Sequence, residues 1–119
     1  MKILIVDDSS AMRMMVLRAL RQAGYGDSDI DQAEDGAMAL GRIREEVPDL
    51  VLADWNMPNM TGIELLETLQ EEGISCKFGF ITTESNTNMR KRATDAGAKF
   101  LLQKPFTPDS FERAVSSVI

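Results

Sequence analysis

The chain has 119 residues, of which 44% are hydrophobic, and its formal net charge at pH 7 is −6. A chain of this length suits one domain, residues 1–119, and the excess of acidic residues argues against binding to nucleic acid, which depends on Lys and Arg. The sequence contains no histidine, which excludes a Ser-His-Asp triad, Cys-His proteolysis and zinc sites with His ligands.

Two further features concern the cellular compartment. The single cysteine, Cys76, cannot form an internal disulfide bond. The apolar run near the N-terminus, "KILIV", is too short for a signal peptide or a membrane span before acidic residues follow. We therefore expect a cytoplasmic protein that does not insert into a membrane.

Short apolar segments with the length of β-strands recur along the chain. The first and third are apolar throughout, which is typical of central parallel strands covered on both faces. The second, "DIDQA", has little apolar character and is expected at an edge of the sheet. The five segments are 2–6, 29–33, 49–53, 78–82 and 99–103.

Segments with apolar residues at helical spacing follow each strand. The first helix is expected from Ser10 to Ala23, with Ser9 or Ser10 as its N-cap and Gly24 as its stop signal, and Pro108 suits the start of the fifth. The positions expected to face the core are Ala37, Leu40, Ile43 and Val47 in the second helix, Ile63, Leu66 and Leu69 in the third, and Phe111, Ala114, Val115 and Val118 in the fifth.

The fourth expected helix, residues 86–96, differs from the others. Its apolar line consists only of Met89, Ala93 and Ala96, and the residues at 90–92 are all basic. We expect it to be the least securely packed helix.

The alternation of strands and helices predicts an α/β fold with a doubly wound parallel sheet and right-handed crossovers. In such sheets, sites form at the carboxyl ends of the strands. Asp7 and Asp8 follow the first strand, and Asp54 follows the third. If these strands are neighbours, three carboxylates meet, and their mutual repulsion calls for a hard divalent cation, for which Mg²⁺ is the best fit.

The remaining strand ends carry complementary groups. Thr82 and Thr83 close the fourth strand, and Lys104 follows the fifth. A carboxylate, a cation, a hydroxyl and an ammonium group are the parts needed to accept a phosphoryl group: Asp54 would attack phosphorus, while Mg²⁺, Lys104 and a threonine would hold the phosphoryl oxygens. Each residue alone also suits an ordinary cap, strand or surface position, so the prediction depends on their coincidence at one edge.

These residues lie in segments that resemble the receiver domains of bacterial two-component response regulators, and the single-domain chemotaxis type most closely. The similarity covers essentially the whole chain through "ILIVDDS", "LADWNMPNMTG", "FITTES" and "FLLQKPFTP". It implies a flavodoxin-like receiver fold with five helices and the strand order 2-1-3-4-5, an order that comes from the family.

The resemblance also implies a role for individual residues. Asp54 would be the phosphoacceptor, Thr82 rather than Thr83 the switch hydroxyl, and Lys104 a contact of the phosphoryl group, with a cis peptide bond before Pro105. The chain would be a switch that assists its own phosphotransfer and dephosphorylation, not an enzyme with turnover. The implied Mg²⁺ ligands are Asp7, Asp8, Asp54 and the backbone carbonyl of Asn56.

Three positions concern the rate and coupling of the switch. Asn56 and Glu84 match a pair that influences how quickly the acyl phosphate hydrolyses. The family usually has an aromatic residue on the fifth strand where this chain has Leu101. Phe100 is its neighbour, but successive side chains of a strand point to opposite faces, so Phe100 is not expected to replace the aromatic residue.

The resemblance implies two protein partners. The phosphoryl donor would be a phosphohistidine on a sensor histidine kinase. The target would bind in trans to the fourth helix, fifth strand and fifth helix, since no output domain follows Ile119 in this sequence. We expect a monomer, with dimerisation on phosphorylation left open.

Three other functions are alternatives to this one. A phosphatase of the haloacid dehalogenase type would need a second Asp as general acid where this chain has Asn56. A flavin carrier would need a phosphate-binding loop where this chain has "DDSSAM". The third alternative is a receiver-like interaction module that is not phosphorylated.

Overall fold

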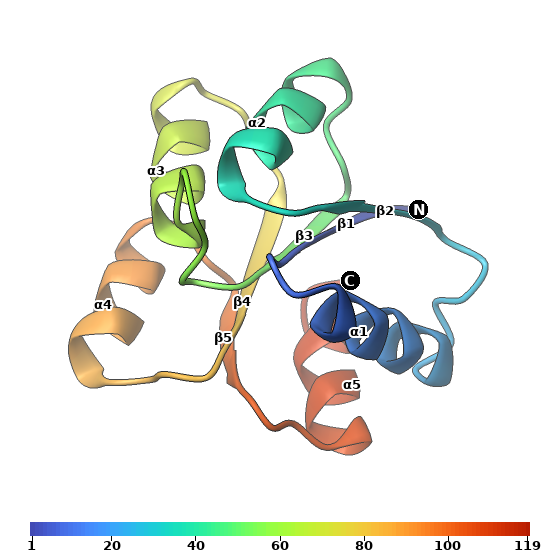
Figure 1. Ribbon diagram of the computed structural model, residues 1–119. Coiled ribbons are helices and arrows are strands. Elements are labelled where there is room, and N and C mark those ends of the chain that lie inside the picture. Colours follow the sequence, from blue (N-terminus) through green and yellow to red (C-terminus); the bar gives the residue numbers. More distant parts are fainter.

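The computed structural model of residues 1–119 contains one sheet of five parallel strands and five helices (Figure 1). The strand order is β2-β1-β3-β4-β5, so β2 lies at an edge as predicted. Every predicted strand is present and agrees with the structure to within one residue at each end. In chain order the elements are β1 (Lys2–Val6), α1 (Ser10–Gln22), β2 (Asp29–Ala33), α2 (Gly36–Glu45), β3 (Leu50–Ala53), α3 (Gly62–Glu71), β4 (Lys77–Thr82), α4 (Thr87–Asp95), β5 (Phe100–Gln103) and α5 (Pro108–Ser116).

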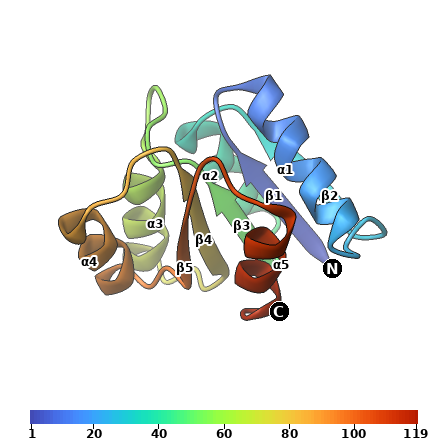
Figure 2. The same ribbon diagram turned by 90° about the horizontal axis from the view of Figure 1, so that it is seen from below.

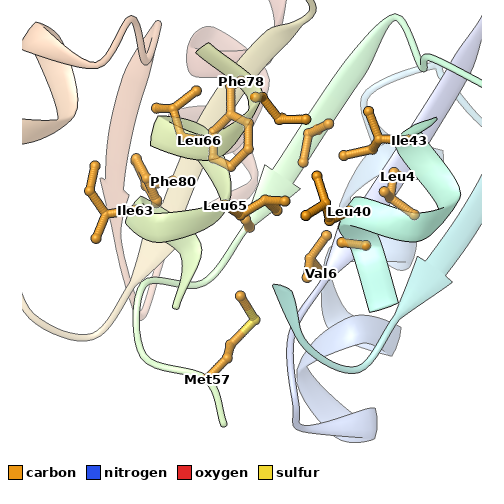
Figure 3. Packing of buried hydrophobic residues seen from close by; sticks show 14 of the residues in the cluster. Leu4, Val6, Leu40, Ile43, Met57, Ile63, Leu65, Leu66, Phe78 and Phe80 are labelled. Carbon is orange, nitrogen blue, oxygen red and sulfur yellow. The ribbon is translucent and has the colours of Figure 1, made fainter. Parts of the chain in front are cut away.

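The helices form two layers around the sheet (Figures 1 and 2). Helices α1 and α5 cover one face, and α2, α3 and α4 cover the other. On β1, Ile3 and Ile5 pack toward α1 and α5, whereas Leu4 and Val6 pack toward the larger cluster on the other face, part of which is drawn in Figure 3. The continuous apolar runs of β1 and β3 thus reflect burial on both faces.

The inner face of α2 differs from the prediction in two residues. Ala37 and Val47 are exposed, and the buried positions of the helix include Ala39, Leu40 and Ile43. The side chain of Asp35 caps the helix, which therefore begins at Gly36. Residues three and four positions apart lie on one face of a helix, so the buried face consists of positions 36, 39, 40 and 43. Val47 lies beyond the last helical residue, Glu45.

Helix α4 has the weakest apolar face. Ala93 is its one buried residue, fewer than in any other helix, and Met89 is half-buried. Val118, predicted to face the core from the fifth helix, is also half-buried but lies beyond the end of α5 at Ser116.

None of the five helices is both long enough and apolar enough to cross a lipid bilayer.

Gly62 lets the start of α3 pass close to the end of β3. A Cβ atom at this position would lie 2.0 Å from the carbonyl oxygen of Asp54. We expect Gly62→Ala to destabilise the protein by about 1–3 kcal/mol, because the backbone must move to admit the methyl group. Urea-induced unfolding measures the effect.

The matched control is Gly41→Ala in α2, where a Cβ would have no neighbour within 4 Å. This change is expected to stabilise the protein by about 0.5–1 kcal/mol through helix propensity. If Gly62→Ala were as stable as the wild type, the close approach of α3 to Asp54 would not exist in solution.

Candidate functional site

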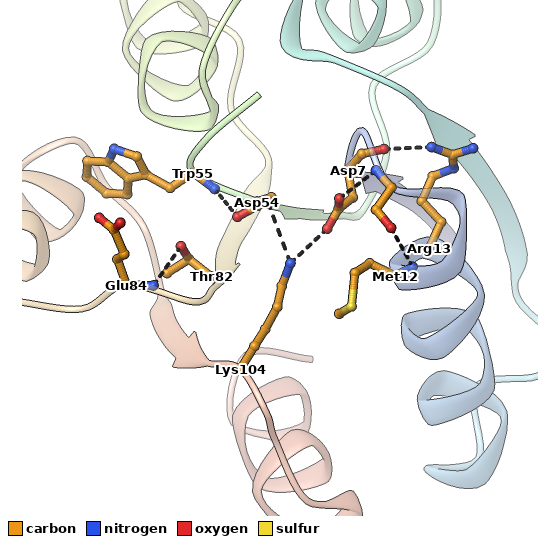
Figure 4. Close-up of polar contacts among 9 residues, drawn as sticks. Asp7, Met12, Arg13, Asp54, Trp55, Thr82, Glu84 and Lys104 are labelled. Carbon is orange, nitrogen blue, oxygen red and sulfur yellow. Dashed lines mark hydrogen bonds and ion pairs between the residues drawn. The ribbon is translucent and has the colours of Figure 1, made fainter. Parts of the chain in front are cut away.

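Parallel pairing brings the predicted residues to one edge of the sheet. The amide of Asp54 donates to the carbonyl of Val6 at 2.9 Å, and the amide of Lys104 donates to the carbonyl of Thr82 at 2.7 Å. The ends of β1, β3, β4 and β5 are therefore aligned. Their terminal side chains converge on a small region (Figure 4).

The ammonium group of Lys104 lies between two carboxylates. Its Nζ atom is 2.9 Å from Oδ2 of Asp7 and 3.5 Å from Oδ2 of Asp54. The side chains of Lys104, Asp7 and Asp54 are only 8%, 5% and 14% exposed. This is a largely desolvated ion cluster, in which loss of the ammonium group would leave two buried carboxylates without compensation.

Asp8 adds a third acid to this cluster. One carboxylate oxygen from each of Asp7, Asp8 and Asp54 can be chosen so that all lie within 4.8 Å of one another. The single ammonium of Lys104 leaves a net negative charge among them. A set of carboxylate oxygens with excess negative charge fits Mg²⁺, and Asp8 and Asn56 are both exposed, so the cluster is open to solvent on that side.

The pKa of Asp54 is raised above its ordinary value. Burial is the main cause, and the negative charge of Asp7 adds to it, while Lys104 and the amide of Trp55 act in the opposite direction. The ionised carboxylate of Asp54 is therefore less favourable in the folded protein than in water.

Backbone amides orient the two buried acids. The amide of Ser9 donates to Oδ1 of Asp7 at 2.9 Å, and the amide of Trp55 donates to Oδ1 of Asp54 at 2.8 Å. Both acids thereby direct Oδ2 toward Lys104. Ser9 also caps α1, since its hydroxyl accepts from the amide of Met12.

Arg13 is a neighbour of the site that the sequence did not reveal. Its guanidinium donates to the backbone carbonyl of Asp7 at 2.7 Å and to Oε1 of Gln32 at 2.9 Å. In the sequence, Arg13 is only a polar residue of the first expected helix, and nothing marks it as a neighbour of the acids. The contact joins α1 to the loop after β1 and to the edge strand β2.

The two threonines at the carboxyl end of β4 are placed differently. Thr82 is fully buried and its hydroxyl accepts from the amide of Glu84 at 3.4 Å. Thr83 and Glu84 are exposed. Thr82 is thus the buried threonine of the two. Figure 4 shows it at the same edge of the sheet as Asp54 and Lys104.

Leu101 and Phe100 lie on opposite faces of β5. Leu101 packs against the cluster formed with α2, α3 and α4, whereas Phe100 packs on the side of α1 and α5. The ring of Phe100 covers Gly79, where a Cβ would lie 2.2 Å from it. Phe100 therefore does not replace an aromatic residue at position 101.

The peptide bond between Lys104 and Pro105 is cis, the isomer that the resemblance implied. Lys104 is the first residue after β5, and its side chain enters the cluster while Pro105 is exposed.

Comparisons with known proteins agree with this arrangement. Residues 3–116 match the family model of the response regulator receiver domain. The chain is 37% identical over 120 residues to chemotaxis protein CheY-3 of Vibrio cholerae, covering 99% of this chain and 91% of that protein. It is 35% identical over 118 residues to the sensor protein EvgS of Escherichia coli K12, covering 99% of this chain.

The chain spans only 10% of the length of EvgS. Among solved structures, the chemotaxis protein CheY4 of Vibrio cholerae has a TM-score of 0.86 at 31% identity, with 99% of this chain and 98% of that chain covered. The chain belongs to the response regulator receiver domain family.

Proposed function

We propose that this chain is a phosphorylation-activated switch of two-component signalling, of the chemotaxis type, with Asp54 as phosphoacceptor. The observation that carries the proposal is the position of Asp54 in a largely buried cluster with Lys104 and Asp7, next to a third acid, Asp8. A carboxylate at this place has an ammonium group and two further acids within reach of the same incoming group.

The phosphotransfer is a single displacement at phosphorus. A carboxylate oxygen of Asp54 attacks phosphorus and forms a new O–P bond, and the bond from phosphorus to the donor breaks with its electron pair leaving on the donor. Lys104 and the hydroxyl of Thr82 hold phosphoryl oxygens. When bound by Asp7, Asp8, Asp54 and the carbonyl of Asn56, Mg²⁺ supplies the positive charge that offsets these oxygens.

The donor in the cell would be a phosphohistidine on a sensor histidine kinase in the cytoplasm. Phosphorylation would bias an existing equilibrium when the Thr82 hydroxyl and the following loop, including Glu84, move toward the new charge. The affected surface is formed by α4, β5 and α5, where a target protein would bind. The thin apolar contact of α4, with Ala93 as its one buried residue, supports movement at this surface.

The chain would not turn over a substrate. The alternative of an aspartyl phosphatase is disfavoured because Asn56 stands where such an enzyme needs a general acid. The alternative of an interaction module that is not phosphorylated is disfavoured by the buried acids, since a scaffold alone gains nothing from a carboxylate whose burial raises its pKa.

Incubation with acetyl phosphate tests the proposal. We expect one phosphoryl adduct on the wild type in Mg²⁺ and none in EDTA, because the carboxylates cannot approach an anionic donor without a cation. Intact-mass measurement detects the adduct, and Trp55 fluorescence follows the same reaction in parallel.

Asp54→Asn is expected to give no adduct, and the matched control Asp27→Asn, at an exposed acid, is expected to react like the wild type. An unreactive wild type, or an adduct of equal yield on Asp54→Asn, would refute the assignment of the phosphoacceptor.

A further inference from the structure

The N-terminus of α2 is tied to the loop between β3 and α3. Oδ1 of Asp35 accepts from the amide of Met38 at 2.7 Å and caps the helix. Oδ2 of the same carboxylate accepts from Nδ2 of Asn59 at 2.8 Å, across 24 positions of sequence. One side chain thus serves both the helix and the loop.

The main chain makes a second contact at the same place. The amide of Gly36 donates to the carbonyl of Met60 at 3.2 Å. A Cβ on Gly36 would lie 2.6 Å from that oxygen, so a residue with a side chain would hold the helix and loop apart.

Asn59 has an unusual backbone conformation that needs external support. Its φ is +67°, the one positive value in the chain outside glycine, and the amide of Met60 donates to the carbonyl of Pro58 at 2.7 Å. This hydrogen bond closes a γ-turn around Asn59, a strained turn. Such residues persist where the surroundings hold them, and they concentrate at functional sites.

The loop begins at the acceptor. It follows Asp54 directly, includes Asn56, and is closed at its far end by a hydrogen bond of 2.8 Å from the amide of Gly62 to the carbonyl of Trp55. Asn59 lies between Asn56 and that closure, so the contact with Asp35 is a side-chain hydrogen bond that restrains the middle of the loop, beside the buried side chain of Met57.

We propose that Asp35 is a positioning residue for the phosphorylation site, and that its hydrogen bond to Asn59 sets the loop conformation on which Mg²⁺ affinity depends. The proposal rests on the proposed function, because it concerns how the same loop presents Asn56. Neither Asp35 nor Asn59 is among the residues that would hold the ion. By reciprocity, Mg²⁺ stabilises the contact between Asp35 and Asn59 as much as that contact favours Mg²⁺.

The test uses two substitutions that spare the local structure. Asn59→Gly removes the side chain but tolerates positive φ, and Asp35→Ser keeps an N-cap group but cannot serve both partners. We expect each to weaken Mg²⁺ binding about tenfold, and the double variant to be no weaker than either. A Mg²⁺ titration followed by the amide NMR signals of Asp7, Asp8 and Trp55 measures the affinity.

A control and a rescue separate positioning from general loss of stability. Asn86→Ser changes the N-cap of α4. The Asn86 side chain accepts from the amide of Met89 and, unlike that of Asp35, makes no hydrogen bond to a second loop, so the variant is expected to bind Mg²⁺ like the wild type. The exchanged pair Asp35→Asn with Asn59→Asp can remake the hydrogen bond with its polarity reversed. We expect this pair to recover most of the lost Mg²⁺ affinity. We also expect it to make the hydrogen exchange of the loop amides slower than in the single variants.

Two results would overturn the proposal. If Asn59→Gly and Asp35→Ser bound Mg²⁺ within about twofold of a wild type that does bind it, the contact would be structural only and the proposed function would stand. If the wild type showed no Mg²⁺ response and no acetyl phosphate adduct, both proposals would fall together.

Discussion

Lys104→Met is expected to destabilise the metal-free protein by about 3–5 kcal/mol. The Nζ atom of Lys104 lies 2.9 Å and 3.5 Å from the carboxylates of Asp7 and Asp54, and all three side chains are largely buried. Methionine fills a similar volume, so the loss comes from two desolvated carboxylates that no longer have a cation between them. Urea-induced unfolding in EDTA, followed by Trp55 fluorescence, gives the free energy of unfolding.

The same variant has a second, diagnostic property. Saturating Mg²⁺ is expected to restore part of the lost stability, because a cation that binds only the folded state stabilises it by mass action. Lys99→Met is the matched control, since Lys99 is exposed and contributes to the fold through its backbone amide. Equal losses in Lys104→Met and Lys99→Met would mean that the buried ion cluster contributes nothing measurable.

The helices and strands could be predicted almost completely because their signals are local, whereas the strand order came from the resemblance to the family. The apolar runs at 2–6 and 50–53 and the polar edge strand at 29–33 indicate their places in a parallel sheet, and the structure confirms them. The errors in α2 came from extending an apolar pattern through Val47, although the helix had ended at Glu45 before Pro48. The helical spacing of apolar residues alone does not locate the end of a helix.

The site could be predicted in part for a related reason. Residues at strand ends are placed by the topology, so Asp7, Asp54, Thr82 and Lys104 could be brought together from the sequence. Contacts that depend on how a loop folds back could not, and Asp35 is the clearest case, since its partner is 24 positions away. An Asp before the first residue of a helix indicates a cap and carries no information about a partner in a distant loop.

Leu101 shows how the structure limits an expectation from family resemblance. The opposite placement of Phe100 and Leu101 leaves no aromatic side chain of β5 on the face of α4. Trp55 and Phe80 do stack near that face, with ring centroids 4.9 Å apart. If Thr82 is coupled to α4 as proposed, the coupling would use aliphatic packing, or the pair of Trp55 and Phe80, rather than an aromatic residue at position 101.

Asp54→Asn is expected to stabilise the protein by about 1 kcal/mol, or roughly 4 °C in the midpoint of thermal unfolding, in addition to abolishing the phosphoryl adduct. The pKa of Asp54 is raised, mainly by burial, so at neutral pH the ionised carboxylate costs stability in the folded state. As the pH falls through this raised pKa the carboxyl group is protonated and the cost disappears. The advantage of Asn is therefore largest near neutral pH and shrinks in mild acid.

Thermal unfolding of both proteins at several pH values in EDTA measures this difference, with Asp27→Asn as a surface control. A variant less stable than the wild type at neutral pH would show that attraction to Lys104 outweighs burial. The opposite signs expected for Asp54→Asn and Lys104→Met have one cause, the burial of carboxylates around a single ammonium group. Burial of ionised groups in such a cluster opposes folding, and a cation that binds only the folded state would offset that cost.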